Sequence, residues 1–322
     1  MTNEILDRTA ERVRSCPLCG SDAIRLLQRI QAEDLARLVA QSISSDAGRE
    51  CAVIDVLEYL LCQTCDLRFF HPALTGSERF YEQLQAFEWY YPGEKPEFEF
   101  ARQYLGVNDT VLEIGCGSGE FGAQTRVAEY VGLEFSAKAA AAARTRGLTV
   151  LQEPVEVHAR AKPEFYDAVC TFQVLEHVAR ADNFLRGCLT LLKPGGLLIV
   201  SVPSTDSFAC GIPNFILDLP PHHVTRWSDR CLRGLPRLLP VDLVELWHES
   251  LQPVHLRTYI QSVLNRLVYG AVGSAVPAVE PRRIASAVSS LNLKLSRLLV
   301  PFFPMSKLRG ISVTAVYRKA SS

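Results

Sequence analysis

Short apolar runs alternate with helix-like stretches along the C-terminal two thirds of the chain, and this alternation most constrains the fold. Runs of strand length cover residues 111–114, 130–133, 149–152, 168–172 and 197–202. Such alternation is typical of a parallel sheet with crossover helices, in which ligands bind at the carboxyl ends of the strands. Further runs at 241–247 and 311–317 complete the expected fold, an α/β, doubly wound, mostly parallel sheet of seven strands.

A glycine-rich turn follows the first run. It reads Gly115-Cys116-Gly117-Ser118-Gly119, and its missing side chains let the backbone turn sharply and approach a ligand. A dinucleotide fingerprint needs a glycine where this chain has Glu120, and a carboxylate there would repel a pyrophosphate. Glu113 suits a ligand ammonium, and Glu134 can accept the hydroxyls of a ribose. The turn therefore favours a ligand with an amino acid end and an adenosine over a nicotinamide dinucleotide.

Charge and hydropathy exclude several partners. The net charge is −1, so no overall positive field exists to hold a phosphate backbone, and we expect no nucleic acid partner. No uncharged apolar run reaches the ~18 residues of a transmembrane helix. Residues 1–14 lack the apolar core of a signal peptide, which indicates a cytoplasmic protein.

Four of the ten cysteines form two CxxC pairs, which are typical of a zinc site. The pairs are Cys16 with Cys19 and Cys62 with Cys65. Four thiolates would close a tetrahedral site, so its role would be structural. The long stretch between the pairs is predicted to hold a helix over 30–42 and a strand over 53–61. Free thiols or a redox pair are the alternative, with Cys51 and His71 as substitute ligands.

The motifs divide the chain into three parts. We expect a zinc-ribbon-like unit at 1–75, an aromatic connecting segment at 76–105, and the large domain at 106–322 with a helical insertion at about 255–308. The connecting segment is expected to dock on the large domain, or to form a pocket wall with Tyr90 and Tyr91. The insertion is interpreted as core or lid packing, with a homodimer contact or a peripheral membrane contact as alternatives.

Ordered motifs over residues 109–201 resemble the class I S-adenosylmethionine-dependent methyltransferases. The motifs are the turn at 113–119, the acid Glu134, and the segments 165–169, 173–178 and 192–196. The resemblance implies S-adenosylmethionine as cofactor, with Gln173 at its methionine end and Glu153 and Pro154 beside its adenine. The implied cofactor residues are Glu113, Gly115, Cys116, Gly117, Gly119, Glu134, Phe135, Glu153, Pro154 and Gln173.

A zinc-binding unit ahead of this fold resembles sugar C-methyltransferases and related enzymes of surface-glycan and natural-product clusters. We therefore expect methyl transfer to a small acceptor, a hydroxyl of a sugar, of a glycan precursor such as a lipid-linked glycan, or of a natural product. A sugar C-methyltransferase is the alternative within the class. An NAD-dependent oxidoreductase and a non-catalytic zinc-ribbon interaction protein are the alternatives outside it.

The candidate base for such a reaction lies in the loop that follows the fifth run. His222 and His223 come after Pro220 and Pro221, and histidine is the ordinary base at neutral pH. A loop histidine that only donates a structural hydrogen bond is the competing interpretation. His177 begins a predicted helix, and we expect it to pack or to bond on the cofactor side rather than act as the base.

Overall fold

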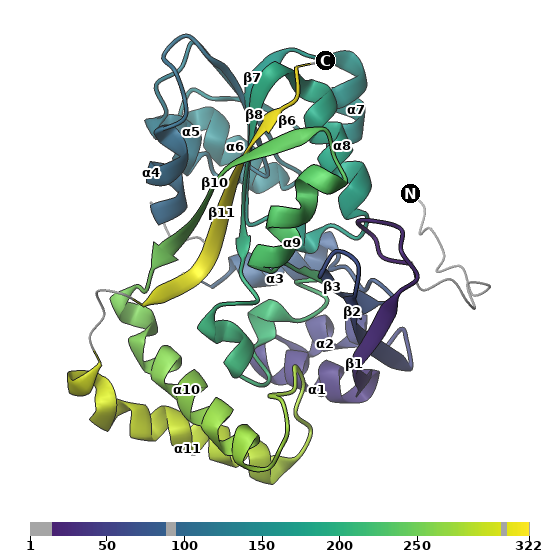
Figure 1. The fold of residues 1–322 in the computed structure, drawn as a ribbon, viewed down its shortest axis with the longest axis vertical. Coiled ribbons are helices and arrows are strands. Elements are labelled where there is room, and N and C mark those ends of the chain that lie inside the picture. The colour runs from purple at the N-terminus through teal and green to yellow at the C-terminus, as the bar shows by residue number, and fades with distance from the viewer. Residues whose placement is uncertain (1–14, 88–94, 304–307, 322) are drawn as a thin grey trace.

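A seven-stranded sheet forms the centre of the computed structural model, which describes residues 15–87, 95–303 and 308–321. The strand order is β10-β11-β8-β7-β4-β5-β6, with parallel pairing from β6 to β8 and an antiparallel β11 between β8 and β10. The strands are β4 (Thr110–Ile114), β5 (Glu129–Leu133), β6 (Thr149–Leu151), β7 (Tyr166–Phe172), β8 (Leu192–Pro203), β10 (Val241–Ser250) and β11 (Arg309–Lys319). The predicted fold class is confirmed (Figure 1).

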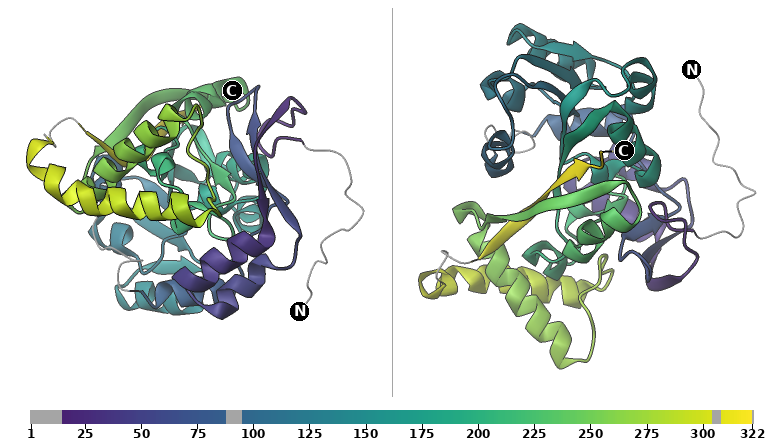
Figure 2. Two further views of the ribbon diagram at one scale, coloured as in Figure 1. Left: turned by 90° about the horizontal axis from the view of Figure 1, so that it is seen from below. Right: turned by 45° about the horizontal axis from the view of Figure 1, so that its top comes forward.

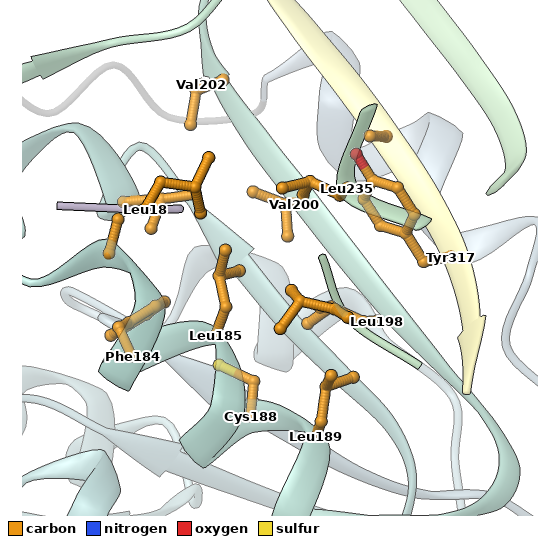
Figure 3. Packing of buried hydrophobic residues seen from close by; sticks show 14 of the residues in the cluster. Leu18, Phe184, Leu185, Cys188, Leu189, Leu198, Val200, Val202, Leu235 and Tyr317 are labelled. Carbon is orange, nitrogen blue, oxygen red and sulfur yellow. The ribbon is translucent and has the colours of Figure 1, made fainter. Parts of the chain in front are cut away.

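Helices that lie before, between and after the parallel strands cover the sheet. They are α4 (Pro96–Arg102), α5 (Glu120–Gln124), α6 (Ala137–Thr145), α7 (Val155–Ala161), α8 (Ala181–Leu191) and α9 (Asp229–Gly234). On α8 the apolar residues Leu185, Cys188 and Leu189 recur at helical spacing and are buried against Leu198 and Val200 of β8 (Figure 3). Removal of these side chains from water is what holds α8 to the sheet.

The N-terminal unit has a small sheet of its own, in the order β1-β2-β3-β9. Its elements are β1 (Ile24–Gln31), α1 (Ala32–Ser42), α2 (Ser45–Cys51), β2 (Val56–Cys62), β3 (Arg68–His71) and α3 (Glu78–Gln85). The predicted helix at 30–42 and strand at 53–61 are confirmed as α1 and β2. The fourth strand, β9 (Thr225–Arg226), comes from the large domain, so the two parts share a sheet. The predicted division at residues 75 and 105 stays a prediction.

The first CxxC pair is packed into the main core rather than standing apart. Leu18 lies in the same buried cluster as Phe184 and Leu185 of α8 (Figure 3). The amide of Asp182 donates a hydrogen bond to the carbonyl of Pro17 (3.1 Å). The N-terminal unit is thereby fixed at the start of α8.

Two helices lie between β10 and β11, inside the predicted insertion. They are α10 (Leu256–Ala271) and α11 (Arg283–Leu299). Buried amides join them, because Asn265 Nδ2 donates to Ser289 Oγ (3.0 Å) and Asn292 Nδ2 donates to Asn265 Oδ1 (2.9 Å). Figures 1 and 2 show the pair projecting beyond the ends of β10 and β11. Among the described residues, no helix has the length and apolar character needed to cross a membrane.

Candidate active site

A large cavity opens at the carboxyl ends of β4, β5, β7 and β8, where the strand order reverses. Its volume is about 1640 Å³. Ligand pockets commonly enclose ~300 to 1,000 Å³, so the cavity has room for two small molecules side by side. The loops after these strands line it, and the segments 75–82, 95–98, 203–223 and 249–255 contribute further lining residues.

The glycine turn forms one end of the cavity. Gly115 has φ +74°, and a Cβ there would lie 2.4 Å from Cγ2 of Val174, so only glycine fits. Gly117 also has positive φ, and its amide donates to Glu134 Oε2 (3.0 Å). Both glycines line the cavity. Gly119 does not, because its Cα faces Leu148, which a Cβ would approach to 2.5 Å.

Glu113 lies at the end of β4 with its carboxylate buried beneath the turn. Only 2 % of the residue is exposed, and the hydroxyl of Tyr130 donates a hydrogen bond to it. Burial raises the pKa of Glu113 to about 8, although the bond from Tyr130 works in the opposite direction. The group is a cavity-lining acid that holds its proton at neutral pH until a cation approaches.

The acid after β5 is held by the backbone. Glu134 accepts bonds from the amides of Gly117 (3.0 Å) and Ser136 (2.7 Å), which fixes the carboxylate between the two loops. The neighbouring Phe135 is 71 % exposed and lines the cavity, so its ring offers an apolar face to a ligand. Cys116 lines the cavity too, but its buried thiol packs over Gly132.

The predicted adenine contacts lie away from the cavity wall. Glu153 and Pro154 are not among the lining residues. The carboxylate of Glu153 pairs with Nδ1 of His158 (2.6 Å), and Pro154 precedes the first residue of α7. Their assignment to the cofactor stays a prediction.

Gln173 connects the cavity to Glu97 of the connecting segment, a residue that the sequence did not indicate. Its φ is +57°, a conformation that residues other than glycine adopt rarely and often at functional sites. Its Nε2 donates to Glu97 Oε1 (3.2 Å) and to Ser312 Oγ (3.1 Å). Glu97 is 3 % exposed, and burial raises its pKa. Only tertiary packing brings this residue of the connecting segment here, and no motif marks it.

The connecting segment forms a wall of the cavity on both sides of its undescribed part. Tyr81, Lys95, Glu97 and Phe98 line it. Tyr90 and Tyr91, for which the pocket-wall alternative was raised, lie outside the described residues. The segment therefore borders the site through these four described residues.

Three histidines gather in another part of the cavity lining. His222 and His223 stack with their ring centroids 4.4 Å apart, and His177 meets them edge-on at 4.6 and 4.9 Å. His177 is expected from the sequence to pack or to bond on the cofactor side, and its ring packs against the pair from the short 3-10 helix after β7. Burial lowers the pKa of His177 to about 4 and lowers the pKa of His222 and His223 well below the usual value. All three are therefore neutral at pH 7.

Glu176 lies against this cluster. The residue is 1 % exposed, and neither carboxylate oxygen has a hydrogen-bond partner among the described residues. Its Oε1 is 3.9 Å from His223 Nε2 and 4.0 Å from His177 Nε2. Burial raises the pKa of Glu176 to about 8. A buried acid without partners is costly, and protonation of Glu176 reduces that cost.

The four cysteines of the N-terminal unit converge as their spacing predicted. Cys16 Sγ lies 3.5 Å from Cys65 Sγ, and Cys19 Sγ lies 3.5 Å from Cys62 Sγ. All four ligand atoms lie within 4.8 Å of one another, and none is in a disulfide. A tetrahedral zinc ion with Zn–S bonds of ~2.3 Å requires sulfurs ~3.8 Å apart, which this group fits. Cys51 is buried in a different cluster.

The fold and the cavity are those of an α/β enzyme with its site at the carboxyl ends of the strands. A family model described as a methyltransferase domain matches residues 83–266, more than half of the chain. The chain belongs to the methyltransferase domain family, as the motifs predicted. This membership favours methyl transfer over the hydride transfer of the nicotinamide alternative.

Curated relatives match a shorter part of the chain than the family model does. The ubiquinone biosynthesis O-methyltransferase of Serratia proteamaculans is 37% identical over 113 residues, which is 32% of this chain and 47% of that protein. The enzyme of the same name from Proteus mirabilis is 37% identical over 99 residues, 28% of this chain and 40% of that protein. The chain thus spans about half the length, or less, of the curated relatives it matches.

Solved structures match part of the chain at low identity. A SAM dependent methyltransferase from Archaeoglobus fulgidus matches at 18% identity and a TM-score of 0.44, over 69% of this chain and 92% of that chain. A coclaurine N-methyltransferase bound to N-methylheliamine and SAH matches at 17% identity and a TM-score of 0.44, over 69% of this chain and 71% of that chain.

Proposed function

We propose that this protein transfers the methyl group of S-adenosylmethionine to a hydroxyl of a small acceptor, a sugar, a glycan precursor or a natural product. One observation carries the proposal. A single cavity of about 1640 Å³ is lined both by the glycine turn with Glu113 and by the histidine cluster. Donor and acceptor can therefore meet inside one cavity, as an in-line displacement requires.

The donor end suits a zwitterionic nucleoside ligand. The ammonium of the methionine part would pair with Glu113, whose buried carboxylate lacks a cationic partner of its own at hydrogen-bond distance in the described chain. The amides of the glycine turn and the carboxylate of Glu134 would hold the ribose, with Phe135 against the base. Gln173 would lie beside the methionine end, between the donor and the acceptor.

S-adenosylmethionine supplies an electrophilic methyl group on a sulfonium centre. In the transfer, the acceptor oxygen forms a bond to the methyl carbon, the carbon–sulfur bond breaks, and its electron pair stays on sulfur. The protein must orient the hydroxyl and provide for the loss of its proton. His222 and His223 are the residues that we assign to this step, because they line the acceptor end in neutral form. The O-methyltransferase names of the matched relatives support oxygen as the acceptor atom.

The four-cysteine group is proposed to hold one zinc ion with a structural role. All four sulfurs would be ligands, which leaves no coordination position for a substrate. Because Leu18 and Pro17 of the first pair are packed on α8, zinc would stabilise the docking of the N-terminal unit on the large domain. The proposed parts of the chain remain 1–75, 76–105 and 106–322.

The test replaces both histidines. His222→Asn with His223→Asn keeps polar side chains but removes the imidazole, and we expect turnover to fall by ~100-fold or more. Binding of S-adenosylhomocysteine, measured by calorimetry, should change little because the glycine turn, Glu113 and Glu134, to which we assign the cofactor, are unchanged in this variant. His248→Asn, on β10 and outside the cavity lining, is the control and should retain wild-type turnover.

Isotope-labelled S-adenosylmethionine and mass spectrometry of the products would identify the acceptor and the methylated atom. Methylation of oxygen is the expected result. Methyl on carbon would replace the proposal by the sugar C-methyltransferase alternative, and an absence of any labelled product across a panel of sugar and natural-product hydroxyls would count against it. Unchanged turnover in the double variant would remove the histidines from the reaction.

A further inference from the structure

The histidine cluster has the arrangement of a metal centre rather than of isolated bases. His177 comes from the turn after β7, and His222 with His223 comes from the loop after β8. One ring nitrogen from each lies within 4.8 Å of the other two. Three imidazoles at one point bring together the ligand type that zinc, iron, nickel and copper prefer.

Each ring is oriented through its Nδ1 by a backbone carbonyl or a carboxylate oxygen. His177 Nδ1 lies 2.6 Å from the carbonyl of His222, His222 Nδ1 lies 2.9 Å from the carbonyl of Leu217, and His223 Nδ1 lies 3.2 Å from Asp218 Oδ1. A carbonyl or carboxylate only accepts, so the neutral rings carry their proton on Nδ1 and have a lone pair on Nε2. Histidines that ligate metals are held in this manner almost without exception, because the Nδ1 bond fixes the tautomer and the ring orientation.

A buried acid beside the three rings would balance part of the charge of a bound cation. Glu176 has no hydrogen-bond partner for either oxygen within the described ranges, and its Oε1 is 3.9 and 4.0 Å from Nε2 of His223 and His177. A desolvated acid left without a partner costs ~1 to 3 kcal/mol or more. A divalent cation between the imidazoles and Glu176 would remove that cost.

We propose that His177, His222 and His223 bind one divalent transition-metal ion, and that Glu176 balances part of its charge. A tetrahedral site with metal–nitrogen bonds of ~2.0 to 2.1 Å needs nitrogens ~3.3 Å apart, so the rings would close by up to roughly 1.5 Å on binding. The three ligands leave a coordination position on the cavity side. The site is distinct from the four-cysteine group, which lies in the N-terminal unit.

The ion would explain the proton transfer in the proposed reaction, and only this consequence rests on the proposed function. The ion would make a hydroxyl at its open position more acidic, because it would stabilise the alkoxide. The hydroxyl proton would leave to water, the oxygen would form its bond to the methyl carbon, and the electron pair of the carbon–sulfur bond would stay on sulfur. His222 and His223 would then act on the proton through the ion that they hold.

The metal content of the purified full-length protein tests the site without reference to turnover. Wild type, His177→Asn and the variant with His222→Asn and His223→Asn are stripped with a chelator, loaded with excess Zn²⁺, desalted and analysed by plasma mass spectrometry. We expect wild type to hold one more zinc per chain than either histidine variant. With Co²⁺, the sulfur-to-cobalt absorption of the four-cysteine group should be the same in all three, which shows that the difference arises at the histidines.

Two further variants keep the result interpretable. Glu176→Gln preserves shape and removes charge, and should weaken the second zinc site by ~10- to 100-fold in calorimetry, the usual scale for a supporting residue. His248→Asn should keep the wild-type zinc content. If a histidine variant loses its circular dichroism spectrum, the Glu176→Gln isotherm decides in its place.

The outcomes separate the metal site from the proposed function. Equal zinc content in wild type and folded histidine variants, or an unchanged Glu176→Gln isotherm, would refute the metal site. Methyl transfer by a protein that lacks the second zinc would leave the proposed function standing without it. A second zinc in a protein that methylates no acceptor would leave the metal site standing and overturn the function.

Discussion

The buried acid Glu113 should release a proton when the cofactor binds, and this release can be counted. Its pKa of about 8 means that ~0.9 of the carboxyl groups are protonated at pH 7 in the unliganded protein. Pairing with the ligand ammonium favours the carboxylate, so binding of S-adenosylhomocysteine should release ~0.9 proton at pH 7 and only ~0.1 at pH 9. Calorimetry in buffers of different ionisation enthalpy measures this number directly.

Substitutions assign the proton to this group. Glu113→Gln should abolish the release. The control Glu129→Gln changes an acid at the start of β5, outside the cavity lining, and should leave the release unchanged. Tyr130→Phe removes a donor that favours the charged form, so the pKa of Glu113 should rise and the release should persist at higher pH. A wild-type protein that releases no proton at pH 7, or a Glu113→Gln protein that releases as much as wild type, would refute the reasoning.

The same pKa shift has a consequence for the unliganded protein. The native state binds more protons at Glu113 than the unfolded state does between the ordinary pKa of 4.5 and the raised pKa of about 8, so stability falls as the pH rises through this window. The loss between pH 5 and pH 7 is ~2.5 kcal/mol. Urea denaturation at the two pH values should show a smaller decrease in Glu113→Gln by about that amount, and equal decreases would contradict the assignment.

Two further predictions concern the glycine turn and the cysteines. Gly119→Ala should cost ~1 to 3 kcal/mol in urea denaturation, because φ is +82° and the new Cβ would meet Leu148, yet leave ligand affinity nearly unchanged. Gly115→Ala, whose Cβ would meet Val174 in the cavity wall, should instead weaken S-adenosylhomocysteine binding in calorimetry. Cys19→Ser should lower both the zinc content at the four-cysteine group and the melting temperature, and an unchanged melting temperature would argue against a structural zinc.

Local patterns in the sequence were enough to predict the large sheet and the glycine turn. The runs at 111–114 and 168–172 became β4 and β7, because continuous apolar stretches of this length are buried on both faces of a parallel sheet. Ser228 precedes α9 and accepts a hydrogen bond from the amide of Cys231. A serine at this position is a helix N-cap that can be recognised from the sequence. These features depend on a few neighbouring residues and need no knowledge of the rest of the chain.

The sequence selected His222 and His223, but the assembly of the acceptor end around them could not be predicted in this way. His177 and His222 are 45 positions apart, and only the return of the chain after β8 brings their rings together. The strand β9 has two residues, too few for any periodic pattern, although it completes the N-terminal sheet. Glu97 enters the cavity because α4 packs against the sheet through Phe98 and Phe100, a contact between segments distant in sequence.

This division between local and tertiary signals explains why family membership fixes the donor more firmly than the acceptor. The donor end consists of strand termini and the glycine turn, which the sheet itself creates in any chain of this fold. The acceptor end is built from loops and from the N-terminal part, and Tyr81, whose hydroxyl lies 3.3 Å from His177 Nδ1, falls outside the family match at 83–266. Relatives that match 32% of the chain or less do not identify an acceptor that binds there. Its chemistry must therefore be determined at the histidine cluster and Glu176, where the metal measurement and the labelled-methyl experiment both act.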